Sequence, residues 1–341
     1  MKRVQLGAGK EFDLIRRFVY AGAGDDVAVG PGDDIAVGPG DDAAVLRDGW
    51  VVTTDLSVEG VHFRREWLTD EEVGWRAAAV ALSDLAARAA TPVAVLVSMA
   101  VPTTEGGDSV SGGVDVEAVQ RGVRAASSSV GAVVVGGDLT RSPGPLFVDV
   151  VALGRTAWPV QRDGAEAGDH VWVTGTLGAA AAAVTLWEAG DQPPEPLRRA
   201  FAHPEPRVEA ARCLVEQEVV DALIDLSDGL AGDAGHLAAA SGVTVILEED
   251  TLPVEPAVVD TLGAERAREL ALFGGDDYEL CFVTDPGVVD PEYFRRKYGL
   301  QLTRVGTVIP ATEDGPGVRL RGADGVVRSL HRSGFDHWGT D

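Results

Sequence analysis

The chain has 341 residues, of which 45% are hydrophobic and 24% are charged, and its formal net charge is −25. This length predicts about two domains, and the composition is typical of a globular protein with more than one packed core. The acidic excess excludes nucleic acid and anionic membrane surfaces as expected partners, because binding to them depends on lysine and arginine contacts with phosphate.

The sequence also lacks the features of membrane and secreted proteins. It has no apolar run long enough for a membrane-spanning helix, and its first residues lack the apolar core of a secretory signal. Cys213 and Cys281 fall inside apolar patterns, which favours buried, reduced thiols. We therefore expect a cytoplasmic protein.

The first half of the chain is predicted to alternate strands and helices after a short amphipathic helix at residues 11–20. The unit Gly-Asp-Asp-x-Ala-Val then recurs three times with a period of eight, beginning at Gly24, Gly32 and Gly40, as a tandem duplication in a loop would. The elements that follow are strands at 43–46 and 50–58, a helix at 69–90, a strand at 93–101, a Gly-rich loop at 102–113, a helix at 115–130, and strands at 133–135 and 146–153.

A domain boundary is predicted near residues 154–168, which divides the chain into 1–154 and 155–341. The elements expected beyond it are a strand at 170–174, a helix at 178–188, a Pro-rich irregular connection at 191–206, a helix at 207–218, a strand at 222–226, a helix at 230–240, and strands at 243–247, 278–284 and 302–308. This alternation predicts a mixed α/β architecture in both halves.

The common phosphate-binding and catalytic motifs are absent from the sequence. Gly7-Ala8-Gly9-Lys10 lacks the upstream Gly and the following Ser or Thr of a P-loop. There is no HExxH pair, no Ser-centred elbow and no Cys/His constellation. A nucleotide site in this chain would therefore need another source of positive charge.

Aspartates instead recur where apolar or Gly-rich chain surrounds them. Taken singly, Asp228 is typical of a helix N-cap and Asp138 of a turn. Asp84 is harder to explain structurally, since an unpaired carboxylate on an apolar helix is costly. The segments concerned are Asp41-Asp42, Thr53-Thr54-Asp55, Leu82-Ser83-Asp84, Gly136-Gly137-Asp138, Asp225-Leu226-Ser227-Asp228-Gly229 and Gly274-Gly275-Asp276-Asp277-Tyr278-Glu279.

Clustered carboxylate oxygens select Mg²⁺ or Ca²⁺, and adjacent glycines let a phosphate approach backbone N–H groups. The chain contains only Lys2, Lys10 and Lys297 as lysines, so a bound polyphosphate must be neutralised by metal. The residues alone therefore predict a Mg²⁺-nucleotide enzyme outside the P-loop class.

Nine motifs, in their order and spacing, resemble the thiamine-monophosphate kinase family, within the superfamily of aminoimidazole ribonucleotide synthetase. The resemblance covers nearly the whole chain. The motifs are Glu11-Phe12-Asp13-Leu14-Ile15, Gly40-Asp41-Asp42-Ala43-Ala44, Thr53-Thr54-Asp55, Val61-His62-Phe63, Leu82-Ser83-Asp84-Leu85-Ala86-Ala87, Gly136-Gly137-Asp138-Leu139-Thr140-Arg141, Asp225-Leu226-Ser227-Asp228-Gly229-Leu230, Gly274-Gly275-Asp276-Asp277-Tyr278-Glu279-Leu280 and Ser333-Gly334-Phe335-Asp336-His337-Trp338.

This resemblance implies a two-domain α/β fold whose N-terminal domains pair into a barrel-like homodimer. It implies ATP-dependent phosphorylation of thiamine monophosphate to thiamine diphosphate, by direct in-line transfer assisted by several Mg²⁺ ions. The implied Mg²⁺ ligands are Asp42, Thr53, Thr54, Asp55, Asp84, Asp138, Asp225 and Asp228. The implied ATP contacts are Gly137, Asp138, Arg162 and Ser227. The implied contacts with thiamine monophosphate are His62, Asp276 and Phe335.

The sequence departs from the family pattern in three respects, one of which is the triplicated Gly-Asp-Asp segment itself. Asp276 stands where the family often has Glu, and Gln120 stands where an aromatic residue often precedes the Gly-Gly-Asp motif. Within the repeat, only the third copy runs directly into the strand at 43–46 and then, after Arg47-Asp48-Gly49, into the strand that carries Asp55. We therefore predict that Asp42 is the ligand, and that the first two copies form a mobile surface loop.

Two alternatives remain open. Aminoimidazole ribonucleotide synthetase is the nearest enzymatic one, and it should lack the His62 and Phe335 elements. A Mg²⁺- or Ca²⁺-binding protein without catalytic activity, built on the Gly-Asp-Asp repeats, is the other.

Overall fold

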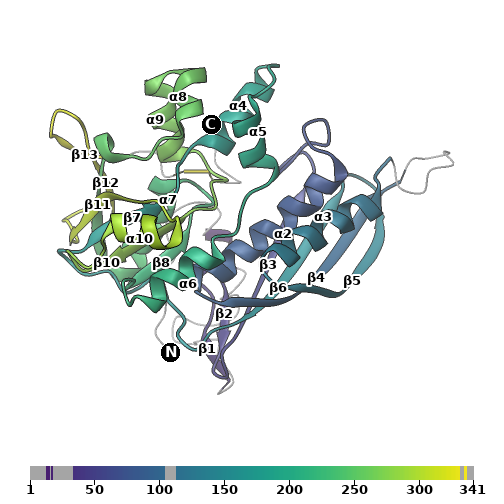
Figure 1. Cartoon of the computed structure of the whole chain (residues 1–341), viewed down its shortest axis with the longest axis horizontal. Coiled ribbons are helices and arrows are strands. Elements are labelled where there is room, and N and C mark those ends of the chain that lie inside the picture. Colours follow the sequence, from purple (N-terminus) through teal and green to yellow (C-terminus); the bar gives the residue numbers. More distant parts are fainter. Residues whose placement is uncertain (1–12, 16, 18–33, 104–112, 331–333, 336–341) are drawn as a thin grey trace.

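The computed structural model describes residues 13–15, 17, 34–103, 113–330 and 334–335 (Figure 1). Two β-sheets, each with helices packed on it, make up the fold, so the expected mixed α/β architecture is confirmed. None of the described helices is both long and apolar enough to cross a membrane.

The first sheet has the strand order β1-β2-β3-β6-β4-β5, in which only β4 and β5 are parallel neighbours. Two helices cover one of its faces (Figure 1). The elements are β1 (Ile35–Val37), β2 (Ala44–Leu46), β3 (Trp50–Val58), α2 (Asp70–Ala87), β4 (Thr91–Pro102), α3 (Val116–Ser129), β5 (Val133–Ser142) and β6 (Phe147–Arg155).

Helix α2 is the central element of the molecule, and its sequence explains its start and its packing. Thr69 and Glu72 form a capping box, with the Thr69 N–H donating to Glu72 at 2.8 Å, which satisfies N–H groups at the helix start. Gly74 and Gly122 let α2 and α3 cross closely. A Cβ at Gly74 would lie 1.9 Å from the backbone oxygen of Val119.

The second sheet has the strand order β13-β12-β9-β11-β7-β10-β8, in which only β12 and β9 are parallel neighbours. Its elements are β7 (His170–Thr174), α4 (Ala179–Glu188), α5 (Glu195–Ala202), α6 (Val208–Glu216), β8 (Ala222–Asp225), α7 (Leu230–Ser241), β9 (Val243–Glu248), a 3₁₀ turn (Glu249–Thr251), α8 (Pro256–Leu262), α9 (Ala264–Phe273), β10 (Leu280–Thr284), α10 (Pro291–Tyr298), β11 (Leu302–Pro310), β12 (Gly317–Arg321) and β13 (Val327–Ser329).

Both faces of the second sheet are buried. Because successive side chains of a strand point to opposite faces, neighbouring residues enter two different cores. Trp172 and Phe282 stack with ring centroids 6.5 Å apart and share a core with α6 and α10. Val171, Val173 and Cys281 point the other way, into a core shared with α7. A strand buried on both faces has a continuous apolar sequence, as residues 280–283 of β10 do.

Helices α4 and α5 complicate the division of the chain. Their residues belong to the same hydrophobic core as the first sheet, where Trp187 stacks on Trp67 with centroids 5.0 Å apart. The chain leaves the first sheet at Arg155 and enters the second at His170. We propose a domain division at residues 154/155 on the basis of the sheets, with α4 and α5 packing back across it.

Three expectations from the sequence are wrong. Residues 191–206 are not irregular, because α5 lies within them and carries Pro196 in its first turn, where a missing N–H is harmless. Gly136–Asp138 do not form a turn but continue strand β5. In the second Gly-Asp-Asp copy, Ile35–Val37 form β1 and pair with β2, so this part is not a free loop. The first copy lies outside the described residues.

Candidate active site

Three aspartates from distant parts of the chain meet where the two sheets adjoin. Asp42 precedes β2, Asp84 lies in the last turns of α2, and Asp225 ends β8. One carboxylate oxygen from each lies within 4.8 Å of the others. The structure therefore brings together three of the residues that the family resemblance implies as Mg²⁺ ligands.

Two hydroxyl groups orient these carboxylates. The Thr53 hydroxyl donates to Asp84 Oδ2 at 2.6 Å, and the Ser83 hydroxyl donates to Asp225 Oδ2 at 2.6 Å. Thr53 is buried on the side of β3 that faces α2. The implied ligand Thr53 therefore contacts the cluster through Asp84, which limits how far the carboxylate can rotate.

The cluster is electrostatically crowded. Burial, and then the charges of Asp225 and Asp42, raise the pKa of Asp84 well above its ordinary value. Burial, and then the charge of Asp42, raise the pKa of Asp225 to about 6. Carboxylates held together in this way favour a bound cation, which would restore their ionised form.

Two buried arginines balance part of this charge. Arg88, at the end of α2, pairs with Asp42 and also with Asp41 at 2.6 Å, and Arg162 pairs with Asp42. Burial opposes ionisation of Asp42, but Arg162 and Arg88 outweigh it and lower its pKa. Arg162, an implied ATP contact, thus lies at the cluster. Sequence reasoning missed Arg88, whose only signal is a charge among the alanines that end α2.

A second group lies beside the first, on the loop before α7 and on its first turns. Asp228, Asp233 and His236 each offer a ligand atom within 4.8 Å of the others. The Asp233 carboxylate also accepts hydrogen bonds from the N–H groups of Asp228 and Gly229, both at 3.1 Å. Burial, and then the charge of Arg162, lower the pKa of His236 to about 3, so this imidazole is neutral. Asp233 and His236 were missed from the sequence, although their spacing puts them on one helix face.

The two groups line one cavity of about 240 Å³. Among the described residues, its wall carries six aspartates and one arginine, so negative charge exceeds positive charge in that part of the wall. Ser227, an implied ATP contact, is part of the same wall. The lining residues are Ile15, Gly40, Asp41, Asp42, Asp84, Arg162, Asp225, Ser227, Asp228, Asp233 and His236.

Two of the three implied substrate residues are hydrogen-bonded to the wall of this cavity: the N–H of Asp276 donates to the backbone oxygen of Ser227 at 2.9 Å, and Phe335 bonds Asp228. The N–H of Phe335 donates to the backbone oxygen of Asp228 at 3.0 Å, which fixes Phe335 beside the second group. The Asp276 carboxylate accepts a hydrogen bond from Arg76 at 2.6 Å. Burial raises the pKa of the neighbouring Asp55 to about 6, although the positive charge of Arg76 acts to lower it. His62 lies in the turn after β3, where its Nδ1 accepts from the N–H of Val58 at 3.0 Å.

Three implied residues lie away from the cavity. The Thr54 hydroxyl donates to Asp149 at 2.8 Å on the face of β3 opposite Thr53. Asp138 is exposed on β5, the edge strand, and β6 and β4 separate it from β3. A Cβ at Gly137 would lie 1.7 Å from the backbone oxygen of Val97, so close strand pairing accounts for this glycine. The described chain does not bring these side chains to the Asp42 cluster.

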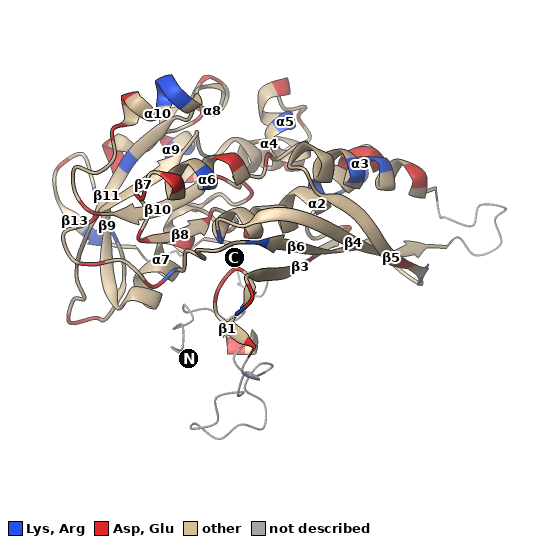
Figure 2. Ribbon diagram, turned by 60° about the horizontal axis from the view of Figure 1, so that its bottom comes forward, with Lys and Arg blue, Asp and Glu red and all other residues tan. Residues whose placement is uncertain are grey.

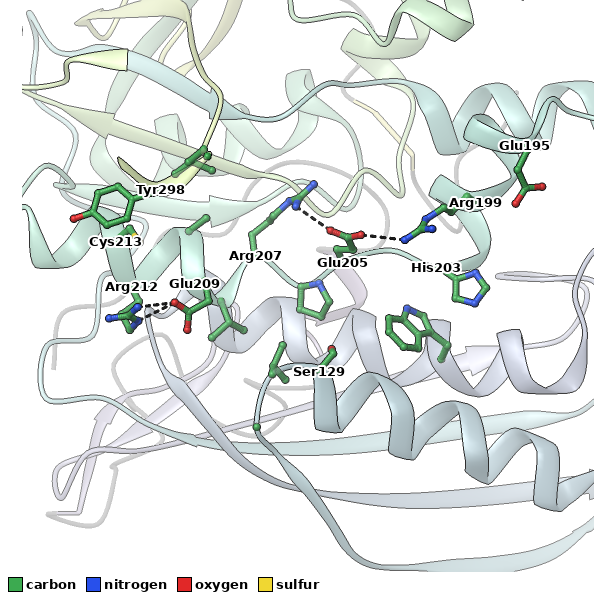
Figure 3. Close-up of a pocket in the computed structure, with 18 residues that line it drawn as sticks. Ser129, Glu195, Arg199, His203, Glu205, Arg207, Glu209, Arg212, Cys213 and Tyr298 are labelled. Carbon is green, nitrogen blue, oxygen red and sulfur yellow. Dashed lines mark hydrogen bonds and ion pairs between the residues drawn. The ribbon is translucent and has the colours of Figure 1, made fainter. Parts of the chain in front are cut away.

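A larger cavity of about 1040 Å³ lies elsewhere, between the end of α3, the α5–α6 connection and the end of α10 (Figure 3). Its arginines are paired with glutamates: Arg199 with Glu205 at 3.6 Å, Arg207 with Glu205 at 3.3 Å and Arg212 with Glu209 at 2.6 Å. Because these charges compensate one another, we assign the candidate active site to the smaller acidic cavity.

Comparisons with known proteins agree with this arrangement. Residues 40–156 match the AIR synthase related protein N-terminal domain, and residues 166–318 match the AIR synthase related protein C-terminal domain. The thiamine-monophosphate kinase of Rhodopirellula baltica is 35% identical over 330 residues, which cover 95% of this chain and 93% of the relative.

Two solved structures extend the likeness to three dimensions. The thiamine-monophosphate kinase of Stenotrophomonas maltophilia is 36% identical with a TM-score of 0.72, covering 94% of this chain and 98% of that one. AaThiL complexed with AMPPCP and TMP is 30% identical with a TM-score of 0.77, covering 99% of both chains. The chain therefore belongs to the thiamine-monophosphate kinase family.

Proposed function

We propose that this chain transfers the γ-phosphoryl group of ATP to thiamine monophosphate, giving thiamine diphosphate and ADP. The observation that carries the proposal is the acidic cavity formed by Asp42, Asp84 and Asp225, with Arg162 in its wall. Its relative AaThiL was solved with AMPPCP, an ATP analogue, and TMP. A noncatalytic ion-binding protein would not need an arginine and a serine beside the acids, whereas an ATP site would.

The donor set suits Mg²⁺, which takes oxygen ligands and retains some of its waters. Asp42, Asp84 and Asp225 would hold one ion, and the neighbouring Asp228 and Asp233 offer oxygens for a further one. When bound, Mg²⁺ neutralises charge between the reacting phosphates. We propose several ions, because the cavity carries more carboxylates than a single ion would use.

The protein residues act by binding and orienting the reactants. Arg162 and Ser227 would bind the phosphates of ATP, and Asp276, His62 and Phe335 would bind thiamine monophosphate. The acceptor is a phosphate monoester with a second pKa near 6, so it is already an anionic nucleophile at neutral pH. We therefore propose direct in-line transfer with no phosphoenzyme and no protein base.

This mechanism predicts strong selection against unphosphorylated thiamine. A hydroxyl acceptor needs a general base, which contributes about 10²–10⁴-fold to such steps. With Mg-ATP and equal concentrations of each acceptor, thiamine should react at least about a hundredfold more slowly than thiamine monophosphate. Chromatographic separation of the thiamine phosphates measures both rates. Comparable turnover of thiamine would refute the mechanism.

We also propose a homodimer formed through the open face of the first sheet. Figure 2 shows α2 and α3 on one side of β3, β6, β4 and β5. On the opposite face, Leu56 is 49% exposed, and Leu96, Val151 and Leu153 are only half-buried. An apolar sheet face of this kind is a typical contact surface for a second copy. Thr54 and Asp138 lie on the same face, so the dimer would enclose them.

Val151→Asp should therefore shift the protein from dimer to monomer, because it places a charge at the centre of the proposed interface. Sedimentation velocity measures the change. Val288→Asp is the matched control, since Val288 is 44% exposed but belongs to the loop before α10. An unchanged sedimentation coefficient for Val151→Asp, or an equal effect of both substitutions, would reject this interface.

We place the reaction in the cytoplasm. Cys213 and Cys281 are both buried and free, and burial raises the pKa of both thiols. Unpaired thiols are typical of a reducing compartment.

A further inference from the structure

A buried arginine on α2 contacts two other parts of the protein. Arg76 has a side chain only 5% exposed, and it donates to Asp276 Oδ1 at 2.6 Å and to the backbone oxygen of Phe201 at 3.0 Å. Its guanidinium group also lies 4.0 Å from the centre of the Phe201 ring. These contacts fix the guanidinium group between α2, α5 and the loop before β10.

Both donors to Asp276 use the same oxygen. The Tyr278 hydroxyl donates to Asp276 Oδ1 at 2.9 Å, the atom that also accepts from Arg76. In the described part of the chain, Oδ2 has no hydrogen-bond donor, and the Asp276 side chain is 30% exposed. One oxygen is therefore anchored while the other remains able to accept a hydrogen bond from a ligand.

The backbone of this loop needs such anchors. Asp276 and Tyr278 have φ values of 71° and 50°, a left-handed conformation that non-glycine residues rarely adopt. The other two acids of the loop are held separately. Asp277 accepts from the N–H of Gly178 at 2.9 Å, and Glu279 accepts from Arg207 at 2.6 Å. Of the described side chains, Arg76 and Tyr278 are the ones that donate hydrogen bonds to Asp276.

The position of Arg76 also suits the charges around it. Asp55 and Asp276 repel one another, and Arg76 attracts both carboxylates. An uncharged residue at position 76 would leave two acids facing each other. Arg76 therefore controls both the orientation of Asp276 and its charge balance.

We propose that Arg76 is a positioning residue for thiamine monophosphate. It holds Oδ1 of Asp276 so that Oδ2 accepts a hydrogen bond from an N–H donor of the substrate, such as its exocyclic amine. ATP binds without this contact. The inference rests on the proposed function, because it concerns how the acceptor is recognised.

Binding measurements on purified variants test this role directly. By calorimetry, Arg76→Gln should weaken thiamine monophosphate binding about ten- to a hundredfold, the scale of a charge-assisted hydrogen bond. AMPPCP binding should change less than about twofold. Arg76→Lys should recover part of the affinity. The double variant Arg76→Gln/Asp276→Asn should bind thiamine monophosphate no more weakly than the weaker-binding single variant, since both substitutions remove the same interaction.

Arg198→Gln is the matched control. Arg198 donates to Glu72 of α2 at 2.7 Å, so its loss disturbs the same helix without touching the Asp276 loop. It should lower thermal stability and leave the affinity for thiamine monophosphate unchanged. Tyr278→Phe removes only the second donor to Oδ1, and should weaken thiamine monophosphate binding by a smaller factor in an otherwise intact protein.

Wild-type affinity for thiamine monophosphate in folded Arg76→Gln would overturn the proposal, as would equal weakening of both ligands. If Arg76→Gln does not fold, wild-type affinity in Tyr278→Phe overturns it instead. If the wild-type protein makes thiamine diphosphate and these variants bind thiamine monophosphate with wild-type affinity, only the proposed role of Arg76 is rejected. If the wild-type protein makes no thiamine diphosphate, the proposed function is rejected as well.

Discussion

Asp84→Asn is expected to lower kcat by about a hundredfold or more, the scale of losing an electrostatic contact with the transition state. Asp84 lies at the centre of the carboxylate cluster and offers one of its three ligand oxygens. An asparagine keeps an oxygen that can accept from the Thr53 hydroxyl, so local geometry should survive. Steady-state kinetics at limiting and saturating Mg²⁺ measure the effect. Near-wild-type activity at limiting Mg²⁺ would mean that Asp84 is not a ligand.

The same substitution should have the opposite effect on the metal-free fold. Burial and the charges of Asp225 and Asp42 raise the pKa of Asp84, so the folded state holds a proton that the unfolded state has released. Stability is therefore lost as the pH rises through the folded pKa. The pKa values of Asp55 and Asp225, each raised to about 6, act in the same direction.

Thermal denaturation in EDTA between about pH 5 and pH 8 tests this predicted direction of the pH dependence of stability. Wild-type protein should lose stability toward the alkaline end, and Asp84→Asn should lose less. Added Mg²⁺ should stabilise the wild type more than the variant, because only the wild type has the complete ligand set. An Asp84→Asn protein less stable than the wild type at the alkaline end would contradict the crowding argument.

Asp42→Asn should reduce activity by a factor on the order of a hundred, whereas Asp34→Asn should stay within about twofold of wild type. Both aspartates occupy the same position in successive Gly-Asp-Asp copies. Asp42 joins the cluster and pairs with Arg88 and Arg162. Asp34 is exposed, and its backbone oxygen accepts from the N–H of Arg47 at 2.8 Å.

The comparison is matched, because each change replaces one carboxylate oxygen in the same sequence context. Circular dichroism confirms folding of both variants before kinetics are compared. Asp42→Asn should also lower thermal stability, because it leaves two buried arginines with less compensation. Equal loss of activity in the two variants would show that the wrong copy has been assigned to the metal.

The sequence singled out aspartates that the structure brings together, while their role as ligands stays a prediction. Asp84 lies in an apolar helix, where an unpaired carboxylate is costly, so the sequence pointed to a ligand there. Arg76, Arg88 and Asp233 were missed for the opposite reason. Charged residues are common in helix sequences, and only the packing of the folded chain shows that these three side chains are buried.

Other features of the structure depend on strand pairing and side-chain direction, which a sequence pattern does not reveal. Gly136–Asp138 have turn-like composition but continue β5, because β4 supplies their hydrogen bonds. Thr53 and Thr54 are adjacent, yet the strand period sends them to opposite faces of β3. Thr54 and Asp138 lie on the open face of the first sheet, so their surroundings depend on what covers that face. The sequence of one chain does not predict this.

The most direct test of the central claim follows the phosphorus atoms by ³¹P NMR during reaction of purified protein with Mg-ATP and thiamine monophosphate. The proposed function predicts a growing diphosphate signal of thiamine diphosphate in equal amount to ADP, with no free phosphate, and loss of both products in Asp84→Asn. ADP and free phosphate without thiamine diphosphate would contradict it, since the chain would then use ATP for another acceptor.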